Sequence, residues 1–297
     1  MTQLKDEPAR AVFLTGASGG IGSAAARMLA GRGYRVYAGV RNDSPALRDI
    51  PGVEQIRIEV TDPASVARAA EEVAARQSGV ELHAVVNNAG ILIQGPLELV
   101  PADDLVRQFA VNVFGPVEVI RAFAPLVRAG SGRVINVSAP TAKLPMPFAA
   151  PISASKAALD AISDALRIEL AARDVKVVTV YPGAVDTQIF AKADATGKAA
   201  LQRADPDRVA AYRSQMEAME AATAAMKTAA PDTVANLIAK AIQAPRPKAQ
   251  YAAGDARPAL LLARLPVRLR DRLVMRLLGL GTPPADARHP AAARESH

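Results

Sequence analysis

The feature that most constrains the fold of this chain is a glycine-rich loop between an apolar run and a helical pattern. The loop, TGASGGIG, occupies residues 15–22 directly after the apolar run at 11–14. Glycines there permit a tight turn and a close backbone approach, so that free amides and the N-terminus of the next helix can face a pyrophosphate. This strand–loop–helix order predicts a dinucleotide site, whereas the same glycines in another context would predict only a turn.

Short β-rich runs alternate with alanine-rich helical stretches along most of the chain. Strands are predicted at 11–14, 35–40, 56–60, 84–86, 133–137, 175–181 and 250–253. Regular alternation of strands and helices favours right-handed crossovers and a parallel sheet. We therefore expect an α/β fold, a single-domain Rossmann-type doubly wound sheet of about seven parallel strands with helices on both faces.

The domain organisation follows from where these patterns begin and end. Residues 1–10 are predicted to be an N-terminal tail and 11–254 one dinucleotide-binding domain. Within it, 186–230 is Ala-rich and polar and is expected to form helices over the substrate cleft. Residues 255–281 are predicted to form a basic amphipathic helix, and the prolines and small residues of 282–297 indicate a disordered tail.

Composition excludes several classes of site. The chain has no cysteine, so it forms neither disulfides nor thiolate metal sites, and a cytoplasmic location is expected. Its three histidines, His83, His289 and His297, are too scattered for a metal cluster or a Ser-His-Asp triad. Much of the net charge of +7 lies in the C-terminal segment, without a basic-aromatic cluster, so no nucleic-acid partner is expected.

Five motifs together resemble the short-chain dehydrogenase/reductase family. They are the glycine loop, NNAG at 87–90, VNVFG around Asn112, SASKAA at 153–158, and YPG at 181–183 followed by Thr187. Their order and spacing extend the resemblance from about residue 10 to residue 253. The resemblance implies a nicotinamide dinucleotide cofactor and a small-molecule substrate.

The resemblance also assigns residues to the cofactor site. Contacts to the phosphates and riboses are expected from Thr15, Gly16, Ser18, Gly20, Ile21, Gly22, Asn88, Ala89, Gly90 and Lys156, those to adenine from Glu59 and Val60, and those to the nicotinamide from Pro182, Gly183, Val185 and Thr187. At the end of the second strand, Val40 stands where an acid would bind the ribose of NAD, and Arg41 follows it. A guanidinium can pair with a 2′-phosphate, so NADP(H) is favoured over NAD(H); an ordinary surface role for Arg41 is the alternative.

The resemblance breaks down at the catalytic positions. The family's reaction uses a tyrosine as proton donor, a lysine that lowers its pKa, a serine that holds the substrate oxygen and an asparagine that orders a water. Lys156 and Asn112 match, but the tyrosine position, four residues before the lysine, is Ile152. The serine position, 13 residues earlier, is Ala139. Neither replacement can handle a proton, so the acid–base pair is lost while the cofactor site is kept.

Nearby polar side chains are weak substitutes for the missing pair. Ser138 lies one place before the serine position, and on a strand that offset directs a side chain to the other face unless the strand ends in a bulge. Helix-start, loop or pocket-wall positions are predicted for the other candidates, Ser153, Ser155, Thr141, Lys143 and Tyr181. Lys156 could bind the ribose, act as an unusual acid or form a Schiff base, and ribose binding is favoured.

The basic C-terminal segment forms a separate feature. Residues 257–278 combine apolar residues at helical spacing with six arginines, and Pro266 interrupts the pattern. We expect an amphipathic helix that packs on its own fold, caps an apolar pocket or meets a second subunit, in line with a homo-oligomer. Contact with an anionic membrane surface stays open but is not favoured.

Three functions remain open. The favoured one is an NADP(H)-dependent oxidoreductase acting on a hydroxyl or carbonyl of an apolar small molecule, with the proton handled by water, substrate or a nearby side chain. The second is a non-redox enzyme, a lyase, isomerase or cyclase that reuses the cleft. The third is a catalytically silent NADP(H)-binding protein.

Overall fold

The computed structural model describes residues 10–254 and 256–280, and in it a parallel sheet forms the centre of the molecule. Its strands are β1 (Ala11–Thr15), β2 (Arg35–Val40), β3 (Val53–Arg57), β4 (Leu82–Asn87), β5 (Arg133–Val137), β6 (Lys176–Tyr181) and β7 (Gln250–Ala252). They lie in the order β3-β2-β1-β4-β5-β6-β7, and each neighbouring pair is parallel. The strand order reverses between β1 and β4, which is where ligands bind in such sheets. The predicted fold class is confirmed.

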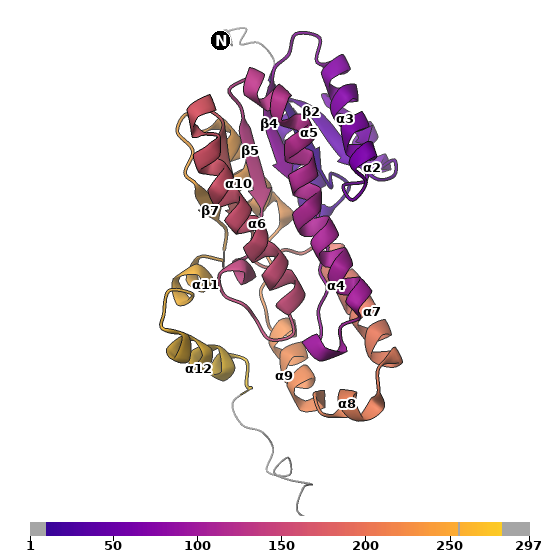
Figure 1. The fold of residues 1–297 in the computed structure, drawn as a ribbon, viewed down its shortest axis with the longest axis vertical. Coiled ribbons are helices and arrows are strands. Elements are labelled where there is room, and N and C mark those ends of the chain that lie inside the picture. Colours follow the sequence, from indigo (N-terminus) through magenta and orange to yellow (C-terminus); the bar gives the residue numbers. More distant parts are fainter. Residues whose placement is uncertain (1–9, 255, 281–297) are drawn as a thin grey trace, which may run out of the picture.

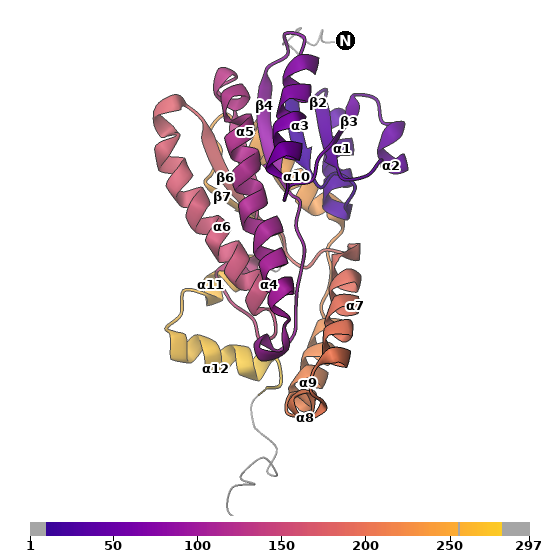
Figure 2. The ribbon, with the colours of Figure 1, turned by 45° about the vertical axis from the view of Figure 1, so that its right-hand side comes forward.

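Helices cover both faces of the sheet (Figures 1 and 2). They are α1 (Gly20–Ala30), α2 (Pro45–Arg48), α3 (Pro63–Arg76), α4 (Ala102–Phe109), α5 (Gly115–Ala129), α6 (Ala150–Glu169), α7 (Gln188–Arg203), α8 (Pro206–Ala210), α9 (Arg213–Ala224), α10 (Pro231–Gln243), α11 (Ala256–Leu262) and α12 (Val267–Leu277), with the short turns η1 (Leu97–Leu99), η2 (Ala110–Phe114), η3 (Pro140–Ala142) and η4 (Ala171–Arg173).

The core consists of two apolar layers, one on each face of the sheet. Residues of α1 and α10, among them Leu29 and Ile238, pack on one face. Residues of α3 and α5, among them Val66 and Phe123, pack on the other. Strand residues therefore alternate between the two layers, as Leu14 and Phe13 of β1 do.

One strand prediction is wrong in its bounds. The third strand, expected at 56–60, is Val53–Arg57, because its ladder with β2 runs from Val36 opposite Val53 to Val40 opposite Arg57. Ile58 and Val60 lie beyond this ladder and are nevertheless buried. Alternating burial therefore continues past the hydrogen-bonded strand, which explains the shifted prediction.

The helical stretch 102–129, made of α4, η2 and α5, is the one described helix long and apolar enough to cross a membrane. Its length and composition are also those of a core helix. Val119, Phe123 and Val127 are buried against the sheet, and the rings of Phe13 and Phe123 stack with their centroids 4.1 Å apart. Packing in the core accounts for its apolar character.

The carboxyl ends of the strands point to one end of the molecule, the lower end in Figures 1 and 2. Helices α7, α8 and α9 occupy the segment 186–230 there, and α11 and α12 lie at the same end. The predicted break at Pro266 falls between α11 and α12. The loops that lead from a strand to the following helix therefore lie at this end of the molecule.

Candidate cofactor and active site

The glycine loop at 15–22 is so tight that Gly16 and Gly22 cannot carry side chains. Gly16 has a positive φ of 66°, and a Cβ there would lie 2.8 Å from the Cα of Ala89. A Cβ on Gly22 would collide with the carbonyl oxygen of Gly16. The backbone thus turns within the loop and starts α1 immediately, as the dinucleotide interpretation requires.

Thr15 and Asn88 tie the glycine loop to the loop after β4. The Thr15 Oγ1 accepts hydrogen bonds from the amides of Asn88 and Ala89, both at 3.1 Å. The Asn88 Nδ2 donates to the carbonyl oxygens of Thr15 and Gly16, at 3.1 and 3.2 Å. Four of the predicted cofactor residues therefore form one connected unit at the point where the strand order reverses.

The N-terminus of α1 is available to an anion. Gly19 caps the helix without a side-chain hydrogen bond, and no acid stands in the first turn. A Cβ on Gly20 would lie 2.6 Å from the Cγ2 of Thr187, so the loop after β6 reaches the glycine loop. A pyrophosphate fits this arrangement, because uncapped amides and the helix dipole both favour negative charge.

Gly90, Asn112 and Lys156 converge at the centre of the site. A Cβ on Gly90 would lie 3.4 Å from the Asn112 Oδ1 and 3.7 Å from the Lys156 Nζ. Asn112, in the π-helical turn η2, is fully buried: its Oδ1 accepts from the amide of Ile91 at 2.9 Å, and its Nδ2 donates to the carbonyl of Ile91 at 3.0 Å. π-Helical turns are frequent at functional sites.

Lys156 is buried on α6, with 8% of its surface exposed, and its Nζ donates to the carbonyl oxygen of Val137 at 2.7 Å. Burial lowers the pKa of Lys156 to about 8, and the nearby Asp160 carboxylate opposes that shift. The Lys156 side chain therefore titrates closer to neutral pH than an ordinary surface lysine does.

Two residues with apolar side chains, Ile152 and Ala139, stand where the sequence analysis placed the family's tyrosine and serine. Ile152 lies one helical turn before Lys156 on α6 and is 8% exposed. Ala139 has extended backbone angles, φ −150° and ψ 153°, so no bulge shifts the side-chain alternation after β5. Ser138 consequently does not take the serine's place: its Oγ donates to the Asp160 Oδ1 at 2.6 Å.

Asp160 is a buried residue that the sequence analysis missed. Besides Ser138, it receives a hydrogen bond from the Tyr181 hydroxyl at 2.8 Å and an ion pair from the Lys143 Nζ at 3.0 Å. We call Asp160, Ser138, Tyr181 and Lys143 the Asp160 cluster. An acid four residues after Lys156, on the same helix face, was the signal that could have revealed it.

Tyr181 corrects a prediction. The sequence placed it on the wall of the substrate pocket, but the side chain is fully buried in the Asp160 cluster. Burial and the Asp160 carboxylate raise the pKa of Tyr181 above its ordinary range. Its phenol stays protonated as a hydrogen-bond donor, so it does not serve as the substitute acid that the sequence analysis considered.

The remaining predicted residues lie along the same end of the sheet. Arg41 is exposed directly after β2, and Ser18 is exposed in the glycine loop. The Glu59 carboxylate accepts hydrogen bonds from Thr61, and Val60 packs against Gly115. Near the nicotinamide positions, Ile21, Pro182 and Gly183 are partly buried, and Val185 forms a bridge with Ala229.

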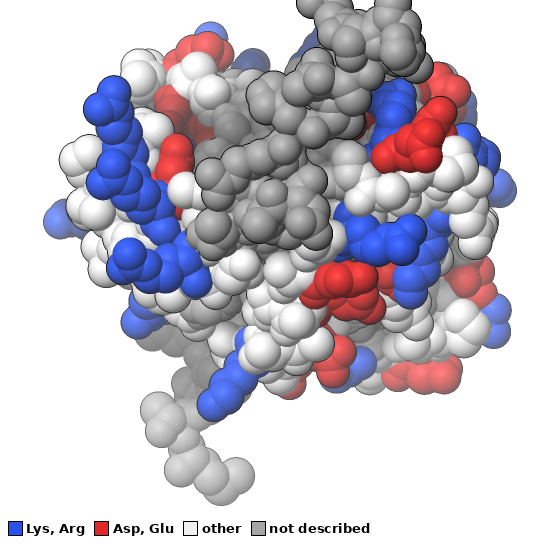
Figure 3. Space-filling view, turned by 90° about the horizontal axis from the view of Figure 1, so that it is seen from below, with Lys and Arg blue, Asp and Glu red and all other residues white. Residues whose placement is uncertain are grey.

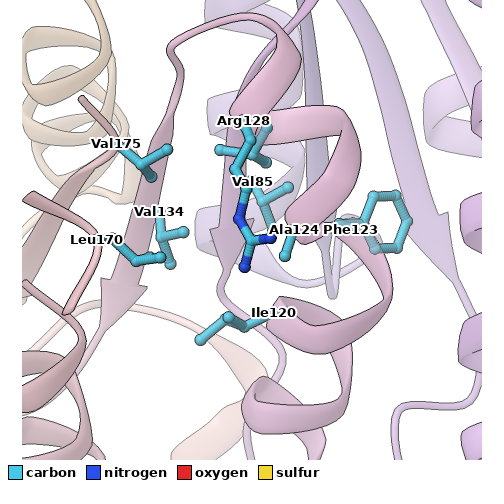
Figure 4. A pocket seen from close by; sticks show the side chains of 9 residues that line it. Val85, Ile120, Phe123, Ala124, Arg128, Val134, Leu170 and Val175 are labelled. Carbon is cyan, nitrogen blue, oxygen red and sulfur yellow. The ribbon is translucent and has the colours of Figure 1, made fainter. Parts of the chain in front are cut away.

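The cavity in Figure 4 lies away from these residues, between α5 and the sheet. It is lined mainly by apolar side chains, including Val85, Ile120 and Val134, and its volume is about 10 Å³. That volume admits about one water molecule. The cavity is therefore a packing gap in the core and not a ligand site.

Comparison with known proteins agrees with this geometry. Residues 10–198 match the family model described as short chain dehydrogenase. The chain is 32% identical over 251 residues to the 3-amino-tetrahydro-pyrrolizinone reductase of Xenorhabdus hominickii, covering 83% of this chain and 87% of that protein. It is 38% identical over 203 residues to the estradiol 17-beta-dehydrogenase 2 of Rattus norvegicus, covering 64% of this chain and 51% of that protein. The match thus spans about half the length of this second relative.

Solved structures show the same fold with either dinucleotide. A short chain dehydrogenase from Burkholderia cenocepacia in complex with NADP superposes with a TM-score of 0.69 at 28% identity, covering 93% of this chain and 98% of that one. A short chain dehydrogenase/reductase from Burkholderia phymatum in complex with NAD gives 0.71 at 26% identity, covering 90% and 95%. The glycine loop, the Asn88 loop and the family model together show that this chain belongs to the short-chain dehydrogenase/reductase family of oxidoreductases.

Proposed function

We propose that the protein is an NADP(H)-dependent oxidoreductase that acts on a hydroxyl or carbonyl of an apolar small molecule, without the usual tyrosine and serine. The observation that carries the proposal is the convergence of Asn112 and Lys156 on Gly90, beside an intact glycine loop. Packing of the core does not require two polar side chains to converge beside the glycine loop. It retains the groups that bind and orient reactants, and lacks those that usually transfer the proton.

Lys156 is the group of this cluster that can supply the proton. Bound NADPH would supply the hydride. The carbonyl oxygen then takes a proton from the Lys156 ammonium, and the resulting amine regains one from water. A general acid is most effective when its pKa lies near the pH at which the enzyme works, and the pKa of Lys156, about 8, is close to neutral pH. Without the phenol we expect reduction to be about 10²- to 10⁴-fold slower than with it.

Arg41 supports NADP(H) over NAD(H). It is exposed at the carboxyl end of β2, where no acid is present to bind a ribose hydroxyl. Calorimetry with NADPH and NADH tests this: Arg41→Ala should weaken NADPH binding about 10- to 100-fold, the usual effect of losing a charge-assisted hydrogen bond, and leave NADH binding unchanged. Equal losses for both dinucleotides would contradict it.

The oxidoreductase proposal is tested by incubating the protein with NADPH and a panel of apolar aldehydes and ketones. Substrate-dependent consumption of NADPH, abolished by Lys156→Met, is the expected result.

A second function, a lyase, isomerase or cyclase, is favoured by the apolar side chains of Ala139 and Ile152, which remove both proton-handling groups from the cleft. Its signature is conversion of substrate with no net change in the dinucleotide.

A further inference from the structure

Helix α12 carries a row of arginines. Arg268, Arg272 and Arg276 recur every four residues, and Arg264 continues the spacing in the turn before the helix. We call these four the arginine row. All four are exposed, and none has an ion pair within the described part of the chain, although Arg270 beside them pairs with Asp271. Figure 3 shows Lys and Arg gathered on the side of this end where α12 lies.

The arginine row does not stabilise the helix that carries it. Like charges four residues apart repel each other on a helix. A helix of 11 residues is also marginal by itself in water. Val274 is the one residue of α12 that is buried, at 7% exposure, so the helix rests on the protein along a narrow contact. Neither ion pairs nor extensive packing within the described chain therefore account for the arginine row.

Three apolar side chains in or next to the arginine row are exposed instead of packed, and we call them its apolar flank. Leu269 is 46% exposed, Met275 43% and Leu277 74%. The sequence analysis favoured packing on the chain's own fold or on a second subunit, or capping of a pocket. Within the described chain these side chains lie in solvent, and contact with a second subunit stays a prediction. A basic helix face beside exposed apolar residues is the pattern of helices that lie in the interface of a bilayer.

The position of α12 adds a second argument. It lies at the end of the molecule toward which the carboxyl ends of the strands point, the end where α7, α8 and α9 also lie (Figures 1 and 2). A surface that binds here would face the mouth of the site. An apolar substrate could then pass from a bilayer to the cleft without crossing water.

We propose that the arginine row and its apolar flank dock this protein on the anionic surface of a lipid bilayer. Anionic headgroups supply the charge that the four arginines lack, and the acyl region accepts Leu269, Met275 and Leu277. Nucleic acid is a poorer match, because α12 has no aromatic side chain on which a base could stack. Docking does not depend on the proposed redox activity.

The test is co-sedimentation of the full chain with vesicles of phosphatidylcholine, with and without phosphatidylglycerol. We expect binding only to the anionic vesicles and a decrease at high NaCl. Each arginine near an anionic surface changes binding about fivefold, so R268Q/R272Q/R276Q should weaken it about 100-fold. The matched control R68Q/R121Q/R173Q removes the same charge from exposed positions on α3, α5 and η4 and should bind like the parent.

A third variant, L269S/M275S, separates insertion from simple charge attraction. It should weaken binding while the salt dependence persists, and circular dichroism should show that each variant is folded. Equal loss in both triple variants would show non-specific attraction to a basic protein and overturn the proposal. Equal binding to neutral vesicles, or no binding by the parent, would also overturn it, and so would self-association in place of vesicle binding.

Discussion

Ser138 donates its hydroxyl hydrogen to the Oδ1 of Asp160 across 2.6 Å. The serine nearest to the family's catalytic position is therefore occupied by a buried carboxylate on α6, while the next residue, Ala139, takes the extended conformation that follows β5. A serine hydroxyl held in this way does not reach a substrate on the opposite face of the strand, toward which Ala139 points. The prediction that the catalytic serine is absent therefore rests on the strand geometry as well as on the sequence.

Restoring both side chains should restore the usual chemistry. We expect Ala139→Ser combined with Ile152→Tyr to raise the rate of NADPH-dependent carbonyl reduction about 10²- to 10⁴-fold, because a phenol one turn from Lys156 regains general acid catalysis. The measurement is kcat/KM on a carbonyl that the parent reduces. Ser138→Ala in the parent, and Ile152→Phe combined with Ala139→Ser, serve as controls and should bring no gain. A gain with phenylalanine would show that ring volume, not the proton, limits the parent.

Removing the charge of Asp160 should destabilise the protein. An asparagine there cannot accept all of the bonds from Ser138, Tyr181 and Lys143, so we expect Asp160→Asn to lower the free energy of unfolding by about 3 kcal/mol. Urea denaturation followed by circular dichroism measures this. Asp194→Asn, which breaks an exposed ion pair with Lys198, should change stability by less than about 1 kcal/mol. Similar values for the two variants would be inconsistent with a buried Asp160 cluster.

The shifted pKa of Lys156 should make the stability of the protein rise with pH above about pH 8. Its pKa is about 8 in the folded protein against 10.5 for an unperturbed lysine, so the folded state binds fewer protons between those values. Stability from this group therefore rises with pH across that window, and below pH 8 the buried charge costs about 3 kcal/mol. Lys156→Met should gain stability relative to the parent near neutral pH, and the gain should shrink as the pH approaches 10.5.

The measurement is urea unfolding of both proteins across that range. The lost hydrogen bond to the Val137 carbonyl lowers the gain by a constant amount and leaves its slope with pH unaffected. Tyr181 is common to both proteins, so its own titration cancels in the difference. A stability difference that stays constant with pH would contradict a shifted Lys156.

The glycine loop should be intolerant of a single methyl group. A Cβ on Gly22 collides with the carbonyl of Gly16, so Gly22→Ala must move the loop that would hold the phosphates. We expect the Kd for NADPH, measured by calorimetry, to rise at least about tenfold, a loss of about 1.4 kcal/mol. Gly31→Ala, at the end of the same helix, is the matched control. Its Cβ would come no closer than 3.4 Å to another atom, the Arg27 carbonyl oxygen, and we expect unchanged binding.

The site divides into parts that the sequence could and could not predict. Thr15, Gly16, Asn88 and Ala89 were predicted from their motifs, because backbone constraints allow few residue types there. Asp160 was not, because an acid on a helix has no recognisable partner until Ser138, Lys143 and Tyr181 are brought to it from β5, η3 and β6. Tyr181 was misplaced for the same reason.

The sequence by itself determined the alternation of strands and helices, the glycine loop, and the residue types at Ile152 and Ala139, where we predict that the family's tyrosine and serine are replaced. These are local properties: periodicity, backbone freedom of glycine, and residue identity at a counted spacing. Only the tertiary structure decided that Ser138 faces Asp160, that burial lowers the pKa of Lys156, and that the arginine row on α12 is exposed. Those properties depend on which segments meet across the sheet, and burial and electric fields arise only once they meet.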